Sequence, residues 1–101
     1  MSHTNREPLP NSPLAALKTA LPDWQLDGTH IERWFEFPNF ELAINFVHQV
    51  AAIARQMDHH PDIDIRYLKV RISLTTHSAG GLTMLDIEAA RRIRALLSGP
   101  L

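Results

Sequence analysis

The chain has 101 residues, of which 45% are hydrophobic and 21% are charged, and its formal net charge is −1 at pH 7. This length and composition fit one globular domain, and the near-zero charge creates no overall field that favours nucleic acid or an anionic membrane. The sequence contains no cysteine, which excludes disulfides and thiolate metal sites. The N-terminal stretch lacks the apolar core of a signal peptide, and no apolar run approaches the roughly 18 residues that cross a bilayer. A cytoplasmic protein without nucleic-acid or membrane partners is therefore expected.

The predicted domain begins after a short polar lead. Residues 1–11 carry two prolines and few apolar side chains, so they are expected to be disordered. Residues 12–101 are expected to form the single domain. Ser12-Pro13 is typical of a helix start, with a capping serine and a proline at the first helical position. Pro22 is expected to end this first helix.

A hairpin and a long helix follow. A short strand is expected over residues 24–26 and a longer alternating strand over residues 30–37, with the turn dipeptide Asp27-Gly28 between them. Apolar residues then recur at helical spacing from Asn39, a good capping residue, to Met57. This segment is predicted to form the longest helix and the central piece of the core.

A second hairpin and a last helix complete the predicted order. Residues 63–67 and 69–76 both alternate in polarity, and the break in phase between them indicates a tight turn or a bulge. A glycine-containing loop comes next. Thr83 and Asp86 then have the form of a capping box, at the start of a helix expected to run to Leu97.

The order helix, strand, strand, helix, strand, strand, helix predicts an α+β fold. Hairpins imply a four-stranded antiparallel sheet, and three helices suffice to cover one of its faces. The other face is then left to water or a partner. The edge strands are natural places for two copies of the chain to associate.

The residues suited to chemistry are three histidines and an aspartate. His59-His60-Pro61 ends the long helix, His77 ends the last strand, and Asp86 opens the last helix. Histidine gives and takes protons near neutral pH, so a place where several converge is a candidate for acid–base chemistry. Two other interpretations stay open: the paired histidines as a polar helix exit favoured by the helix dipole, or the three imidazoles as zinc ligands. Asp86 is also fully explained as a capping residue.

The spacing of these residues resembles that of the pterin-4a-carbinolamine dehydratase family. In that family His-His-Pro is followed at set distances by an aromatic residue, a further histidine and an aspartate, and here Tyr67, His77 and Asp86 take those places. The resemblance covers residues 13–97. Further stretches that fit the family are Asp23-Trp24, Phe37-Pro38-Asn39-Phe40, Thr75-Thr76-His77-Ser78 and Gly80-Gly81-Leu82-Thr83.

The resemblance implies a fold and an activity. The fold of its members is similar to the layout above, with a four-stranded antiparallel sheet and helices on one side. Members form dimers through edge strands, and the dimers often pair into tetramers. The family removes water from a 4a-hydroxytetrahydropterin and gives the quinonoid dihydropterin, which recycles the pterin used by aromatic amino-acid hydroxylases. No metal or other cofactor is needed, because the pterin is the substrate.

The resemblance also implies roles for single residues. His59 and His77 are expected to transfer protons and His60 to position the pterin. Asp86 is expected to orient a histidine, to cap the last helix, or to do both. Contacts with the substrate are expected from Trp24, by stacking on the flat pterin, and from Asp58, Pro61, Thr76 and Ser78.

Arg55 departs from the family pattern. The position four residues before the first histidine usually carries glutamate in the family, whereas an arginine is always charged and cannot act as a base. This difference favours an alternative function, that of a non-catalytic relative which binds a protein. Some members of this fold resemble assembly chaperones for Rubisco in carboxysome-forming bacteria, and mammalian members also bind a transcription factor. The intact set of His59, His60, His77 and Asp86 favours the enzyme.

Overall fold

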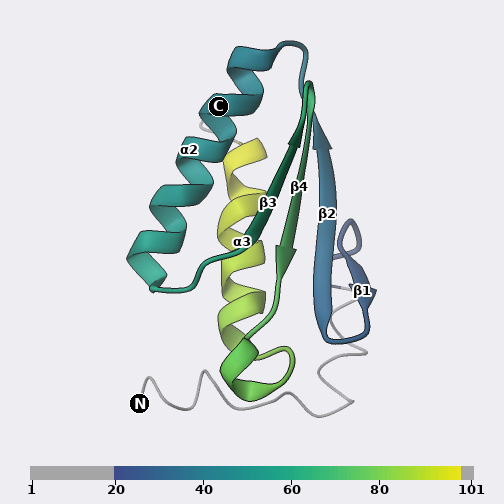
Figure 1. Ribbon diagram of the computed structural model, residues 1–101, viewed down its shortest axis with the longest axis vertical. Helices are drawn as coiled ribbons and strands as arrows, with labels where there is room; N and C mark the ends of the chain where they lie inside the picture. The colour runs from purple at the N-terminus through teal and green to yellow at the C-terminus, as the bar shows by residue number, and fades with distance from the viewer. Residues whose placement is uncertain (1–19, 99–101) are drawn as a thin grey trace.

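The computed structural model describes residues 20–98 of the chain. Figure 1 shows a four-stranded antiparallel sheet, with strands in the order β1-β2-β4-β3 and two long helices on one face. In chain order the elements are β1 Gln25–Asp27, β2 His30–Glu36, α2 Phe40–Met57, β3 Asp62–Arg66, β4 Lys69–Leu74, the short 3-10 helix η2 His77–Ala79, and α3 Met84–Ser98.

The α+β class, the four-stranded antiparallel sheet and the two longer predicted helices are confirmed, but the predicted number of three helices and their order are not. The described residues contain two α-helices rather than three, and they contain the short helix η2, which was not predicted. Their order is therefore β-β-α-β-β-α, with η2 before the last helix. The first predicted helix and the lead of residues 1–11 fall almost wholly on residues 1–19, which lie outside the described part of the chain.

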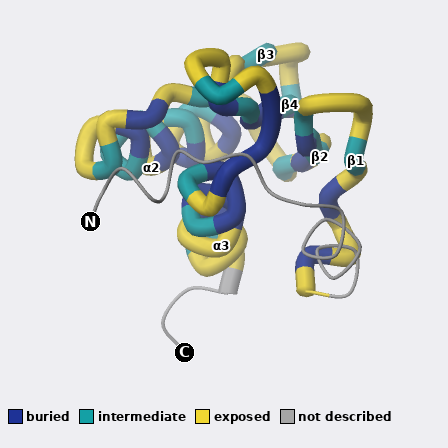
Figure 2. Tube along the Cα trace, turned by 90° about the horizontal axis from the view of Figure 1, so that it is seen from below, coloured by how far each residue is buried: buried dark blue, intermediate teal, exposed yellow. Residues whose placement is uncertain are grey.

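The alternation along β2 and β4 decides which face of the sheet the helices cover. In the antiparallel register Ile31 lies opposite Leu74 and Phe35 opposite Val70, and these four side chains are buried. Trp34, one residue out of phase with Phe35, is 49% exposed on the other face. Figure 2 shows buried positions where the sheet and the helices face each other and exposed positions in the outer turns.

Aromatic rings fill the centre of the core between β2 and α2. Phe46 of α2 packs against Phe35 and Phe37, with ring centroids 4.7 Å and 5.0 Å apart. Trp24 meets Phe35 edge to face at 6.0 Å and is itself buried. Burying one such large side chain stabilises the fold by about 1.5–3 kcal/mol, so this cluster anchors α2 to the sheet.

An arginine ties three strands together on the open face of the sheet. Arg71 of β4 donates to Glu32 of β2 at 2.9 Å and, from Nε, to Asp64 of β3 at 2.9 Å. The hydrogen bonds with Asp64 are the main reason that the pKa of Arg71 lies above its ordinary value. The guanidinium therefore stays charged and cross-links β2, β4 and β3.

The break in phase between the last two strands is a two-residue turn. Tyr67 adopts a left-handed conformation with φ of 54°, which is rare for a bulky side chain. Its ring is 72% exposed and stacks on Phe40, at the start of α2, with centroids 6.4 Å apart. The carbonyl of Leu68, the second turn residue, accepts a hydrogen bond from the Phe37 N–H at 2.9 Å. The hairpin tip is thus fixed to the segment between β2 and α2.

Both ends of α2 have defined caps. Asn39 precedes the helix, and its side-chain oxygen accepts a hydrogen bond from the Leu42 N–H at 2.8 Å. At the other end Asp58 is left-handed, with φ of 50°, its N–H bonds to the Arg55 carbonyl, and the His59 N–H bonds to the Ala54 carbonyl. This pair of bonds is a Schellman motif, in which glycine is the usual left-handed residue. Within residues 20–98, neither helix is both long and apolar enough to cross a membrane.

Replacing Asn39 by alanine removes the N-terminal cap of α2. We expect Asn39→Ala to lower the free energy of unfolding by about 1 kcal/mol, because the Leu42 N–H loses its acceptor. Urea denaturation followed by circular dichroism measures the difference. Asn45→Ala is the matched control, since Asn45 is an exposed position inside the same helix where alanine is favoured. Equal losses in both variants would contradict the capping role.

Replacing Asp58 by glycine removes the left-handed strain at the C-terminal end of α2. We expect Asp58→Gly to raise the free energy of unfolding by about 0.5–1 kcal/mol, because relief of strain and of charge at the negative helix end outweighs the entropy cost of glycine. Asp58→Ala is the control, because it removes the charge but keeps the strained Cβ. A loss of stability in the glycine variant would show that the Asp58 carboxylate makes a stabilising contact.

Candidate active site

The turn after α2 delivers His59 to the interior of the protein. The Schellman motif at Asp58 ends the helix, and the next residue, His59, is only 7% exposed. Its ring nitrogen Nε2 lies 2.6 Å from Oδ1 of Asp86, which belongs to the first turn of α3 and is fully buried. These two residues are 27 positions apart in the chain. The fold therefore brings His59, but neither His60 nor His77, into a hydrogen bond with Asp86 among residues 20–98.

The second carboxylate oxygen of Asp86 is held by two threonines. Its Oδ2 accepts the Thr83 main-chain N–H at 2.9 Å and the Thr76 hydroxyl at 2.8 Å. The two threonine hydroxyls lie 2.8 Å from each other, and both residues are buried. Asp86 thus caps α3 through the Thr83 N–H, as in a capping box, and it also contacts His59.

A tight loop holds Thr76 inside while its neighbours face out. Thr76 and Gly81 form an isolated antiparallel bridge, with the Thr76 N–H bonded to the Gly81 carbonyl at 3.1 Å. Between them η2 is closed by Gly80, whose φ of 74° is left-handed and whose N–H bonds to the His77 carbonyl at 3.0 Å. His77 and Ser78 are exposed on this loop. The buried Thr76 is therefore followed directly in the chain by two exposed polar residues, His77 and Ser78.

The predicted site residues divide into two groups. His59, Thr76 and Asp86 are joined directly by hydrogen bonds. The second group is adjacent to these residues in the chain but makes none of the network's hydrogen bonds within residues 20–98. It consists of the exposed residues Asp58, His60, His77 and Ser78 and the half-buried Pro61.

Two further residues have placements that their predicted roles did not anticipate. Trp24, expected to wall a pocket, is 5% exposed and packs against Phe35 in the core. Tyr67 lies at the tip of the β3–β4 hairpin, at the opposite end of the sheet from η2 (Figure 1). Thr83 was identified only as a capping residue, although its hydroxyl also belongs to the network. The sequence signal for this second role of Thr83 is a polar N-cap residue, which can also bond to another polar side chain, here Thr76, when the fold brings the two together.

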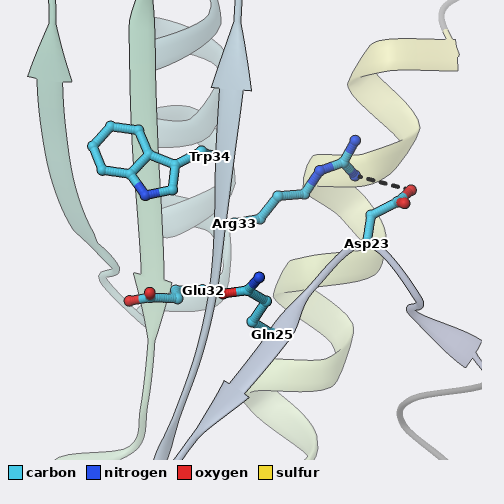
Figure 3. A pocket seen from close by; sticks show the side chains of 5 residues that line it. All are labelled: Asp23, Gln25, Glu32, Arg33 and Trp34. Carbon is cyan, nitrogen blue, oxygen red and sulfur yellow. Dashed lines mark ion pairs between the residues drawn. The ribbon is translucent and has the colours of Figure 1, made fainter.

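A hollow elsewhere on the molecule has different chemistry. About 200 Å³ in volume, it opens beside β1 and β2 and contains none of the predicted site residues. Figure 3 shows Arg33 directed toward Asp23 and Trp34 directed to the other side of β2. The Arg33 and Asp23 charges are 3.7 Å apart, so they form an ion pair without a hydrogen bond. This hollow has no histidine and no acid–base pair suited to proton transfer.

The zinc interpretation requires three ligands around one point. Within residues 20–98 no three histidine, aspartate or glutamate side chains are grouped so that they could hold a metal ion. The His59 nitrogen nearest to Asp86 is already engaged by that carboxylate. The contact observed here is therefore a hydrogen bond between an imidazole and a carboxylate.

Comparison with known proteins relates the chain to one protein family. A sequence model of the family described as pterin 4 alpha carbinolamine dehydratase matches residues 7–96. A relative from Acidobacterium capsulatum named for this dehydratase is 52% identical over 79 residues, which are 78% of this chain and 86% of the relative. One from Thermomicrobium roseum with the same name is 43% identical over 90 residues, covering 89% of this chain and 97% of the relative.

Solved structures give the same result for the fold. A Brucella melitensis protein described as a transcriptional coactivator/pterin dehydratase is 40% identical and superposes with a TM-score of 0.82, covering 87% of this chain and 96% of that protein. A pterin dehydratase-like protein identified as a RuBisCO assembly factor in the alpha-carboxysome has a TM-score of 0.62 at 22% identity, covering 76% and 89% of the two chains. The second likeness concerns the fold alone. Together with the family match, these relatives show that the chain belongs to the pterin-4-alpha-carbinolamine dehydratase family.

Proposed function

We propose that the protein removes water from a 4a-hydroxytetrahydropterin and releases the quinonoid dihydropterin, with histidines as acid and base. The observation that carries the proposal is the buried hydrogen bond of 2.6 Å between His59 and Asp86, beside a loop that exposes His77. Membership of the family supports the substrate class. The pterin is the substrate, and the reaction as proposed uses no metal or resident cofactor.

The reaction needs two proton transfers. The hydroxyl at carbon 4a accepts a proton and leaves as water when the carbon–oxygen bond breaks. The neighbouring ring nitrogen loses its proton, and its electron pair forms the new carbon–nitrogen double bond. The substrate therefore loses one molecule of water with no change of oxidation state, and histidine is suited to both transfers near neutral pH.

The residues present suit different parts of this reaction. One nitrogen of the His59 ring is held by Asp86, so the other is available to the substrate. His77, exposed on η2, is proposed as the second proton-transfer group, and His60, exposed after His59, as a group that positions the pterin. Substrate contacts are proposed for Asp58, Pro61 and Ser78, whereas Trp24, packed against Phe35 in the core, is not expected to stack on the pterin. Thr76 is not proposed to bond to the pterin, because its hydroxyl is bonded to Asp86 and its main-chain N–H and carbonyl are bonded within the loop.

Partners and location belong to the same proposal. A second copy of the chain is expected to pair along an edge strand, and β3, five residues long, offers a longer edge than the three-residue β1. The expected compartment is the cytoplasm.

Removing the proposed proton-transfer groups should abolish most of the activity. We expect His59→Ala and His77→Ala each to lower kcat by about 10²- to 10⁴-fold, the usual contribution of a positioned acid or base. The measurement is the rate of water loss from 4a-hydroxytetrahydropterin above its uncatalysed rate. His48→Ala is the control of the same residue type, because His48 is exposed on α2 outside the network. Unchanged rates in both histidine variants would disprove this assignment.

Arg55 tests whether a carboxylate is needed one turn before His59. Its side chain is exposed in the last turn of α2, where a cation suits the helix dipole. We therefore expect Arg55→Glu to change kcat/KM by no more than about twofold at physiological salt, because exposed charges are strongly screened. Arg55→Gln is the neutral control. A gain of tenfold or more with glutamate alone would mean that the family carboxylate takes part in the site and that Arg55 weakens the enzyme.

The alternative is a protein-binding relative without dehydratase activity, such as a Rubisco assembly factor. Its support is the likeness to the carboxysome assembly factor, which at 22% identity concerns the fold alone. The dehydration assay on the unmodified protein separates the two functions. No rate above background would reject the enzyme and leave the binding function.

A further inference from the structure

We propose that Thr76 and Thr83 are positioning residues whose hydroxyls orient Asp86, so that His59 carries its proton on Nε2 and presents Nδ1 to the substrate. Neither hydroxyl contacts the pterin in this proposal. The assignment of the His59 tautomer stands on the hydrogen bonds alone. Its consequence for catalysis rests on the proposed function.

The direction of each hydrogen bond can be followed from the helix inward. The Leu85 main-chain N–H, which can only donate, bonds to the Thr83 hydroxyl oxygen at 3.2 Å. The Thr83 hydroxyl proton is free to donate, and the Thr76 hydroxyl oxygen lies 2.8 Å away. A hydroxyl has one proton and two acceptor sites, so the direction of this bond is set by where the Thr76 proton goes.

The same count continues to the carboxylate. The Thr76 hydroxyl donates its one proton to Asp86 Oδ2 at 2.8 Å, so in its bond to Thr83 it is the acceptor. The Thr83 main-chain N–H donates to the same oxygen at 2.9 Å. Oδ2 therefore accepts two hydrogen bonds, which suits an ionised carboxylate, and an ionised carboxylate can only accept.

The last link sets the tautomer of His59. Because Asp86 only accepts, the bond of 2.6 Å between its Oδ1 and His59 Nε2 requires a proton on Nε2. In the neutral ring Nδ1 then has a free electron pair and can act as the base. Asp86 and Thr83 are 0% exposed and Thr76 is 2% exposed, so water does not compete for these bonds.

Capping of α3 does not account for the whole arrangement. The capping box needs only Asp86 Oδ2, the Thr83 N–H and the Thr83 hydroxyl. The Thr76 hydroxyl comes from the end of the sheet and satisfies no helix N–H. Its bond to Asp86 holds the plane of the carboxylate and therefore the direction from Oδ1 to His59. A purely structural threonine would affect stability without affecting the tautomer.

Nitrogen NMR of histidine-labelled protein tests the tautomer directly, without substrate. In the unmodified protein we expect His59, assigned by its loss in His59→Gln, to show a protonated Nε2 and an unprotonated Nδ1. Thr76→Val replaces the hydroxyl by a methyl group of similar size, and we expect a mixture of both tautomers. Thr76→Ser keeps the hydroxyl and should restore the unmodified spectrum. Thr75→Val is the control, because the neighbouring Thr75 hydroxyl bonds to the Thr29 carbonyl at 2.7 Å instead of Asp86.

The kinetic expectation is a fall in kcat of about tenfold in Thr76→Val with little change in KM, the effect expected when the outer hydrogen-bond partner of a functional histidine is lost. A proton on Nδ1 in the unmodified protein, or an unchanged tautomer in Thr76→Val, would overturn the proposal. If Thr76→Val does not fold, the tautomer of His59 is read from the spectra of the unmodified protein and of Thr83→Ser, which keeps a hydroxyl. A proton on Nδ1 in either spectrum would still overturn the proposal. An unmodified protein with the expected tautomer but no dehydratase rate would reject the proposed function and leave the positioning role intact.

Discussion

The buried carboxylate of Asp86 is the group on which the rest of this site depends. A carboxylate removed from water is strongly unfavourable unless donors surround it. Three donors do so, and they come from the turn after α2, from the end of the sheet and from the start of α3. Because no single segment supplies all three, Asp86 is satisfied only when α2, the β3–β4 hairpin and α3 are all in place. The same contacts that stabilise the fold around Asp86 therefore also orient the His59 ring.

This dependence explains unusual backbone geometry in two of the segments. Asp58 takes a left-handed conformation that costs free energy for any residue with a Cβ, and that conformation is what turns the chain so that the next residue is buried. The loop around η2 bends back to bridge Thr76 and Gly81, which keeps the Thr76 hydroxyl inside while His77 is exposed. In both places strain or a tight bend separates a buried positioning group from an exposed neighbour.

Local rules made most of the fold predictable from the sequence. The helical spacing after Asn39, the phase break at Tyr67 and the Thr83–Asp86 box each depend on residues a few positions apart, and the structure has all three. The bond between Asp86 and Thr76 was not predictable, because Thr76 continues the alternation of β4 and resembles an ordinary strand end. The burial of Trp24 against Phe35 was missed for a related reason, since residue type alone does not separate a pocket wall from a core residue.

The spacing of the family pattern is best understood as the length of a hairpin. The β3–β4 register begins where Asp62 pairs with Ser73, so His59 and Thr76 each lie three residues beyond the open end of the hairpin. Both of these residues bond to Asp86. The two strands must therefore have matched lengths, so that the end of β4 lies beside the start of β3. Inserting one residue in either strand would reverse the faces of every later side chain and separate the pair. Tyr67 marks the turn at the far end, where it stacks on Phe40. Its place in the pattern is thus explained by the hairpin that brings Thr76 back to the same carboxylate as His59, without any contact between Tyr67 and that network.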